Sequence, residues 1–169
     1  MHPEPDPRWA YIAGGISDDG SVQPMSFEVL ARLASQWAAL LPSAVGEDGP
    51  AALLRTARSL FAHSWFDYDF MVVACLVGFQ AMEAAFRALY PDAERVPFRK
   101  LVERAHQKGI LPSNIAELAD ASVELRNLYS HPATQDTFTI GMAVPMLENT
   151  HRMVALVMSA ASQVSEPQI

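Results

Sequence analysis

Three residues in the C-terminal third of the chain have types and spacing that suit chemistry on a phosphodiester. Arg126 and Asn127 are adjacent, and His131 lies four residues after Asn127. An imidazole can exchange a proton near neutral pH, and a guanidinium can hold the non-bridging oxygens of a phosphate. Asn127 would fix the imidazole or bind a phosphate. This set suits metal-independent RNA cleavage, in which the ribose 2′-hydroxyl attacks the neighbouring phosphate.

The two charged side chains can meet only if the helix that carries them ends at His131. In a regular helix, Arg126 and His131 would lie about 140° apart, whereas Asn127 and His131 share a face. Pro132 disfavours the helical conformation at the residue before it, so the imidazole can leave the helical track and turn toward the arginine. A helix end at this position also favours the charged form of the histidine.

The segment from Arg126 to His131 resembles the R-N-x-x-x-H signature of HEPN domains, an all-helical family of RNA-cleaving toxins, defence nucleases and inactive relatives. The resemblance implies an endoribonuclease that leaves 2′,3′-cyclic phosphate ends. It also implies a homodimer, in which the motifs of two subunits face each other across one composite cleft. Some members carry a tyrosine two residues after the histidine, where this chain has Ala133, so the nucleotidyl modification linked to that tyrosine is not expected here.

A second stretch extends the likeness. The segment from Phe79 to Arg87 is similar to the acidic helix of HEPN proteins, and the resemblance implies that Glu83 and Arg87 support the cleft. The alternative is an ordinary salt bridge between residues four apart on a helix surface. The resemblance covers about residues 60 to 160 and leaves the N-terminal residues unmatched.

The motif itself also has a purely structural interpretation. Arg126 would pair with an acidic residue of a neighbouring helix, and His131 would only cap the end of its own helix. The corresponding functional alternative is a non-catalytic helical module that binds RNA or a partner protein, such as an antitoxin, through the same groove.

The charge distribution gives the RNA hypothesis a candidate surface. The net charge of −7 argues against broad non-specific binding to nucleic acid. Residues 95 to 108, however, contain five basic residues and one acidic residue. Within them we predict that Arg99, Lys100 and Arg104 bind RNA. The alternative is a solvated helix face.

Helical periodicity dominates the rest of the chain. The N-terminal residues are rich in proline, glycine and acidic residues, which predicts an irregular arm over 1–25 with one short extended piece from Trp9 to Ala13. Residues 26–165 are expected to form a single domain, an all-α, HEPN-like bundle of five or six helices. The expected helices are 26–41, N-capped by Ser26, then 51–64, 68–89 at the centre, 98–107, a motif helix from 112 to 131, and 142–164 with Pro145 in its first turn.

Other residue patterns exclude several kinds of site. No histidine spacing fits zinc, so neither a metal nor another cofactor is expected. His63 is expected in an aromatic cluster, and His106 and His151 are isolated. Cys75 is the single cysteine and is expected to be a core residue.

The expected location is the cytoplasm. A lone cysteine cannot form an internal disulfide, which fits a reducing compartment. The first residues lack the basic start and apolar run of a secretory signal. The strongly apolar stretch from Phe70 to Phe79 is shorter than the roughly 20 residues of a membrane span, so no membrane association is expected.

Overall fold

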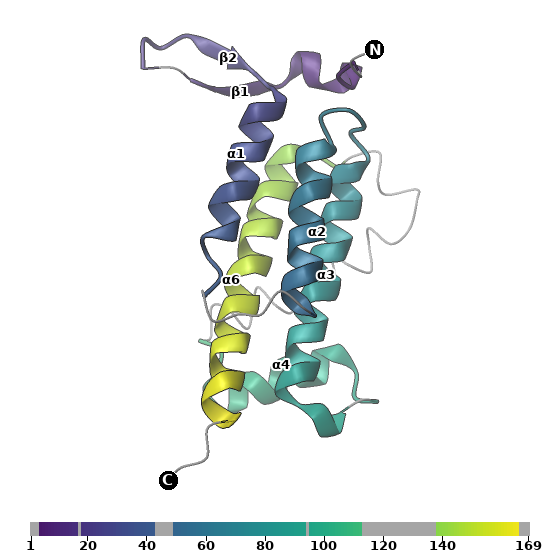
Figure 1. The fold of residues 1–169 in the computed structure, drawn as a ribbon, viewed down its shortest axis with the longest axis vertical. Helices are drawn as coiled ribbons and strands as arrows, with labels where there is room; N and C mark the ends of the chain where they lie inside the picture. The colour runs from purple at the N-terminus through teal and green to yellow at the C-terminus, as the bar shows by residue number, and fades with distance from the viewer. Residues whose placement is uncertain (1–3, 17, 43–48, 94, 113–137, 166–169) are drawn as a thin grey trace.

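The computed structural model describes residues 4–16, 18–42, 49–93, 95–112 and 138–165, and these form a helical bundle with an N-terminal arm (Figure 1). The predicted all-α bundle is therefore confirmed. Two short 3₁₀ helices (Pro7–Tyr11 and Pro91–Ala93) and a two-stranded sheet complete the described secondary structure. The helices and strands are β1 (Ala13–Ile16), β2 (Val22–Pro24), α1 (Phe27–Ala38), α2 (Pro50–His63), α3 (Phe70–Leu89), α4 (Phe98–Gln107) and α6 (Ile140–Ser165).

Helix α1 begins where the sequence predicts. The hydroxyl oxygen of Ser26 accepts a hydrogen bond from the backbone N–H of Val29 at 3.3 Å, which satisfies one of the free donors of the first turn. Leu30, Ala34 and Trp37 then fall on one face of the helix and are buried. The helix stops at Ala38, three residues before the predicted end.

Helix α3 is the centre of the bundle, as its nearly continuous apolar sequence predicts. It packs against α2 and α6 along its length and against α4 near its C-terminal end. Gly78 lets α6 approach closely, because a Cβ atom there would lie 3.3 Å from Cδ2 of Leu147. Among the described residues, α3 is the one helix that is long and apolar enough to cross a membrane by length and composition alone, and half of its most apolar stretch is buried inside the bundle.

Helix α6 begins two residues earlier than the sequence predicts, at Ile140, so Pro145 lies beyond the first turn rather than inside it. A proline there cannot donate a hydrogen bond to the carbonyl of Gly141. Pro145 and Gly141 are both exposed, and water can hydrogen-bond the carbonyl in place of the missing N–H. The proline is tolerated because it faces solvent.

The predicted arm is confirmed, but its local structure differs from the expected extended piece. Residues Pro7 to Tyr11 form a 3₁₀ helix capped by Asp6, and the strands follow it as an antiparallel hairpin that pairs Ile16 with Val22. Gly14 is required in this hairpin, since a Cβ atom there would lie 2.4 Å from the carbonyl oxygen of Pro24.

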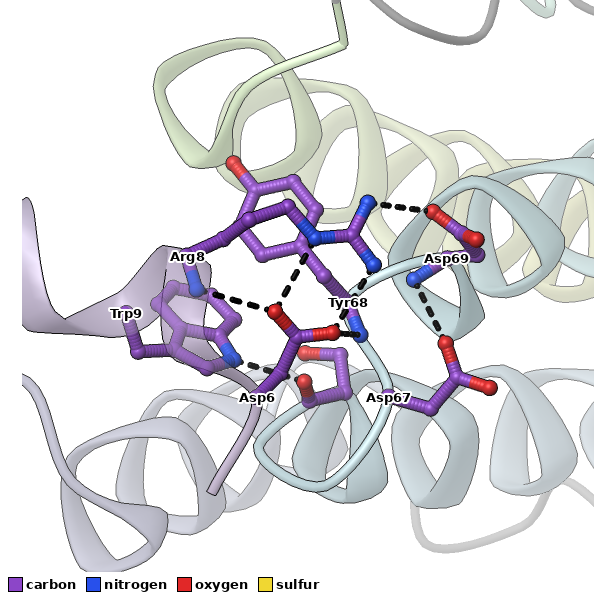
Figure 2. Close-up of polar contacts among 7 residues, drawn as sticks. Asp6, Arg8, Trp9, Asp67, Tyr68 and Asp69 are labelled. Carbon is purple, nitrogen blue, oxygen red and sulfur yellow. Dashed lines mark hydrogen bonds and ion pairs between the residues drawn. The ribbon is translucent and has the colours of Figure 1, made fainter.

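The arm is fastened to the bundle at the turn between α2 and α3 (Figure 2). The indole N–H of Trp9 donates to the carbonyl of Ser64 at 2.7 Å, and the Trp9 side chain is 2 % exposed. Asp6 accepts hydrogen bonds from the Arg8 side chain and from the backbone N–H of Tyr68. Arg8 also reaches Asp69 at 2.7 Å. The hairpin and α4 lie at opposite ends of the long axis of the molecule (Figure 1).

Candidate functional site

The three residues of the sequence motif, Arg126, Asn127 and His131, lie outside the described residues, as does the predicted helix that carries them. The structure does describe the segments on either side. Helix α4 closes at Gly109, whose φ of +70° is the left-handed conformation expected of a glycine after a helix end. The chain is described again from Phe138, just before α6. The candidate site is therefore built from the residues predicted to support the motif.

Glu83 and Arg87 form the ion pair that their spacing on α3 predicts. Nη2 and Nε of Arg87 donate to the same carboxylate oxygen of Glu83, at 2.6 and 3.1 Å. Both side chains are partly buried, with 35 % of Arg87 and 22 % of Glu83 exposed. Nη1 of the arginine also donates to the carbonyls of Ala93 and Val96, at 3.4 and 3.5 Å.

These contacts give Arg87 a structural task. The guanidinium ties the C-terminal half of α3 to the connection that leads into α4. A partly buried pair with further backbone partners resists rotation better than an exposed pair does. The pair therefore helps to set the position of the start of α4 relative to α3.

The basic residues of α4 divide between two sides of that helix. Phe98, Leu101, Val102 and Ala105 form its buried face. Lys100 and Arg104 are four residues apart and share one exposed side, which Lys108 continues just past the helix end. Arg99 lies about 100° around the helix from Lys100. Arg99 therefore lies to one side of the other two, and we call Lys100, Arg104 and Lys108 the basic stripe.

Two members of the basic stripe converge on one aromatic ring. The guanidinium carbon of Arg104 lies 4.4 Å from the ring centroid of Tyr90, and Nζ of Lys108 lies 5.3 Å from it. Tyr90 is the C-cap of α3, so this contact joins the ends of two helices. Lys100 is engaged separately, with Nζ 2.7 Å from the carboxylate of Glu103.

The prediction that His151 is isolated is wrong, and the residue belongs to a buried polar pair that the motif search missed. Nδ1 of His151 lies 2.7 Å from the carbonyl oxygen of Leu147, so the proton is on Nδ1 and is donated there. Nε2 then accepts from Nη1 of Arg58 on α2 at 3.1 Å. Burial and, to a smaller degree, the Arg58 charge lower the pKa of His151 to about 4.

The other described histidines, His63 and His106, and the single cysteine make contacts typical of structural residues. His63 packs against Phe27 and Phe66, which confirms the predicted aromatic cluster. A ring nitrogen of His106 lies 3.1 Å from the carbonyl of Leu111. Cys75 is buried, and burial raises the pKa of its thiol, so it is the core residue that the sequence predicts. The described residues contain no group of metal-binding side chains.

Comparisons of the chain with protein-family models, with curated proteins and with solved structures find no match. The resemblance to HEPN domains therefore depends on the motif and its surroundings in the sequence.

Proposed function

We propose that this protein is a HEPN-like, metal-independent endoribonuclease of the toxin or phage-defence type, acting as a homodimer. Arg126 and His131 are its catalytic residues, and Asn127 supports them. The observation that carries the proposal is the R-N-x-x-x-H sequence followed directly by Pro132. These residue types, at the end of a predicted helix, are those that cleavage of RNA without a metal requires.

Two features of the described structure support the proposal. The chain is a helical bundle, the architecture that the resemblance implies. The helix that precedes the motif in sequence, α4, also presents the basic stripe on one side. Such a stripe can attract an RNA backbone to a protein whose net charge is otherwise negative.

The proposed reaction is an internal transfer at phosphorus. One His131 imidazole removes the proton of the ribose 2′-hydroxyl, and the 2′-oxygen forms a bond to the adjacent phosphorus. The bond from phosphorus to the 5′-oxygen breaks, and the imidazolium that formed in the first step gives its proton to that oxygen. Arg126 stabilises the charge that builds on the non-bridging oxygens. The products are a 2′,3′-cyclic phosphate and a 5′-hydroxyl.

The proposal is tested by cleavage of labelled single-stranded RNA in the presence of a chelator. Wild-type protein should cut the RNA and leave cyclic phosphate ends, because the mechanism involves no metal. His131→Ala should lower the rate by about 10²-fold or more, the usual contribution of a positioned acid or base. His63→Ala, which removes an exposed imidazole from another helix, should cleave like wild type. Equal rates for His131→Ala and wild type would exclude the proposed role.

A non-catalytic binding module is the second candidate. The observation in its favour concerns Glu83 and Arg87, which the resemblance places in the cleft: the two side chains are paired with each other, and Arg87 also donates to the connection before α4. A module would bind RNA or a protein partner with equal affinity before and after His131→Ala, and neither form would cleave. Expression of wild type and His131→Ala in cells also distinguishes the two candidate functions. A nuclease should be toxic as wild type and lose that toxicity in His131→Ala, whereas a binding module should behave the same in both forms.

A further inference from the structure

The phenol of Tyr90 is a buried polar group. The residue is 6 % exposed, and its hydroxyl has no hydrogen-bond partner among the described residues. Burial raises the pKa of this phenol, so it stays protonated and acts as a donor at neutral pH. Leaving such a group unsatisfied costs stability, and proteins rarely do so without a reason.

Two cations lie against the same ring. Arg104 and Lys108 contact the Tyr90 ring, and within the described part of the chain no carboxylate pairs with either side chain. The other described cation of the stripe, Lys100, is paired with Glu103. Positive charge that is held against an aromatic face but not neutralised is available to an anion.

These groups surround one hollow at the α4 end of the bundle. Its volume is about 500 Å³, and it is lined by Leu89, Tyr90, Pro91, Asp92, Arg104, Lys108 and Ile110. Three of these side chains can hydrogen-bond a phosphate group, and the carboxylate of Asp92 is an acceptor that suits sugar hydroxyls. The volume is sufficient for a phosphate with its attached sugar.

We propose that this hollow binds the phosphate and ribose of a ribonucleotide, with Arg104 and Lys108 holding the phosphate and the Tyr90 hydroxyl donating to it. The long side chains of Arg104 and Lys108 turn from the ring toward the anion as it enters. The phenol then gains the acceptor that it lacks among the described residues. Asp92 accepts from the ribose, which sets a nucleotide apart from inorganic phosphate.

Ligand binding to the hollow can be measured without any cleavage. Binding is followed by titration calorimetry on the His131→Ala protein, which keeps any RNA probe intact. The probes are inorganic phosphate, adenosine 5′-monophosphate, and one oligoribonucleotide with either a 5′-phosphate or a 5′-hydroxyl. Stronger binding of the mononucleotide identifies a free nucleotide as the ligand, and stronger binding of the 5′-phosphorylated strand identifies an RNA end.

Substitutions assign the binding to the named residues. Arg104→Gln and Lys108→Gln should each weaken the binding of the preferred probe about tenfold or more, because each removes a charge-assisted hydrogen bond. Each should also reduce the dependence of affinity on salt. Arg152→Gln is the matched control, since it removes an exposed arginine of α6 that pairs with Glu148, and it should bind like the parent protein.

Tyr90→Phe separates a binding role from a structural one. It should weaken binding about fivefold or more. It should also raise the urea concentration at the midpoint of unfolding, because it removes an unsatisfied buried hydroxyl. A purely structural tyrosine would change the midpoint and leave the affinity alone. The proposal is overturned if no probe binds, or if Arg104→Gln, Lys108→Gln and Tyr90→Phe all bind like Arg152→Gln.

Discussion

His151 shows how one buried side chain can make the stability of this bundle depend on pH. Its imidazole is fully buried, with the ring against Trp37 and both nitrogens in hydrogen bonds. Nε2 accepts from the Arg58 guanidinium, so a proton on Nε2 would break that bond and place two positive charges side by side. The native state therefore holds the histidine neutral.

We predict that the protein loses stability as the pH falls from about 6.5 toward 4. The unfolded chain binds a proton at His151 near pH 6.5, whereas the folded chain does so only near pH 4. Within that window the unfolded state binds more protons, so the free energy of unfolding decreases as the pH decreases. Between pH 7.5 and 5.0 this one group should account for about 2 kcal/mol. Urea unfolding at the two pH values measures the change.

His151→Gln is the control for this pH effect, because glutamine can accept from Arg58 but does not titrate. The variant should lose about 2 kcal/mol less than wild type between the same two pH values. Parallel losses in the two proteins would show that other groups produce the pH dependence.

The sequence contained a signal for the burial of His151. Leu147, His151 and Val154 recur at the spacing of one helix face, and Leu147 and Val154 are both apolar. A histidine on an apolar stripe needs a buried partner, and that criterion would have led to a search for Arg58. The identity of the partner could not be predicted, because α2 and α6 are far apart in sequence.

Among the elements of the fold, the N-terminal arm is packed against the helical bundle. Trp9 inserts beside Trp65 and Tyr68, with ring centroids 6.3 and 4.8 Å from its own. The carboxylate of Asp6 is held by Arg8, which keeps its pKa far below the usual range. The same carboxylate accepts from the backbone N–H of Tyr68, and Arg8 also pairs with Asp69, so these contacts anchor the arm to the turn between α2 and α3 (Figure 2).

We predict that Trp9→Ala destabilises the whole protein by roughly 3 kcal/mol, because it removes a large buried side chain and a hydrogen bond to the Ser64 carbonyl. Tyr11→Ala, two residues away at a side chain that is 93 % exposed, should change stability by less than about 0.5 kcal/mol. Urea unfolding of both variants is the measurement. Equal, small effects would mean that the arm is not bound to the bundle in solution.

The helices could be predicted closely where caps and apolar periodicity agree. Ser26 marks the start of α1, and Gly109 follows the end of α4. The arm could not be predicted by periodicity, because its elements are too short to show any. Asp6 followed by Pro7 is nevertheless a typical helix start, and that pair indicated the 3₁₀ helix that replaces the expected strand.

At the scale of the whole molecule, charge is separated along the long axis. The basic stripe lies near one end, and the arm, with its acidic residues, lies at the other (Figure 1). At the α4 end, the basic stripe offsets the repulsion that a negative net charge exerts on nucleic acid. For the proposed RNA substrate, this arrangement favours approach from the α4 end.

The sequence predicts the candidate catalytic groups better than it predicts their assembly. Arg126 and His131 are recognisable because the stop at Pro132 follows them directly. A composite cleft between two subunits involves surfaces that no single chain defines, so the dimer depends on the resemblance. The supporting role of Glu83 and Arg87 is likewise a proposal, although their ion pair is now described.

In the proposed nuclease, the motifs of two subunits act on one phosphodiester, and mixed dimers provide the decisive test. Arg126→Ala and His131→Ala proteins, each inactive alone, are unfolded together, refolded as a mixture and assayed on single-stranded RNA with chelator present. We expect cleavage to return in the mixture, with 2′,3′-cyclic phosphate ends, because the mixed cleft again contains one arginine and one histidine. Wild-type protein, refolded in the same way, is the positive control. If it cleaves the RNA while the mixture is no more active than either variant alone, the two motifs do not share one cleft.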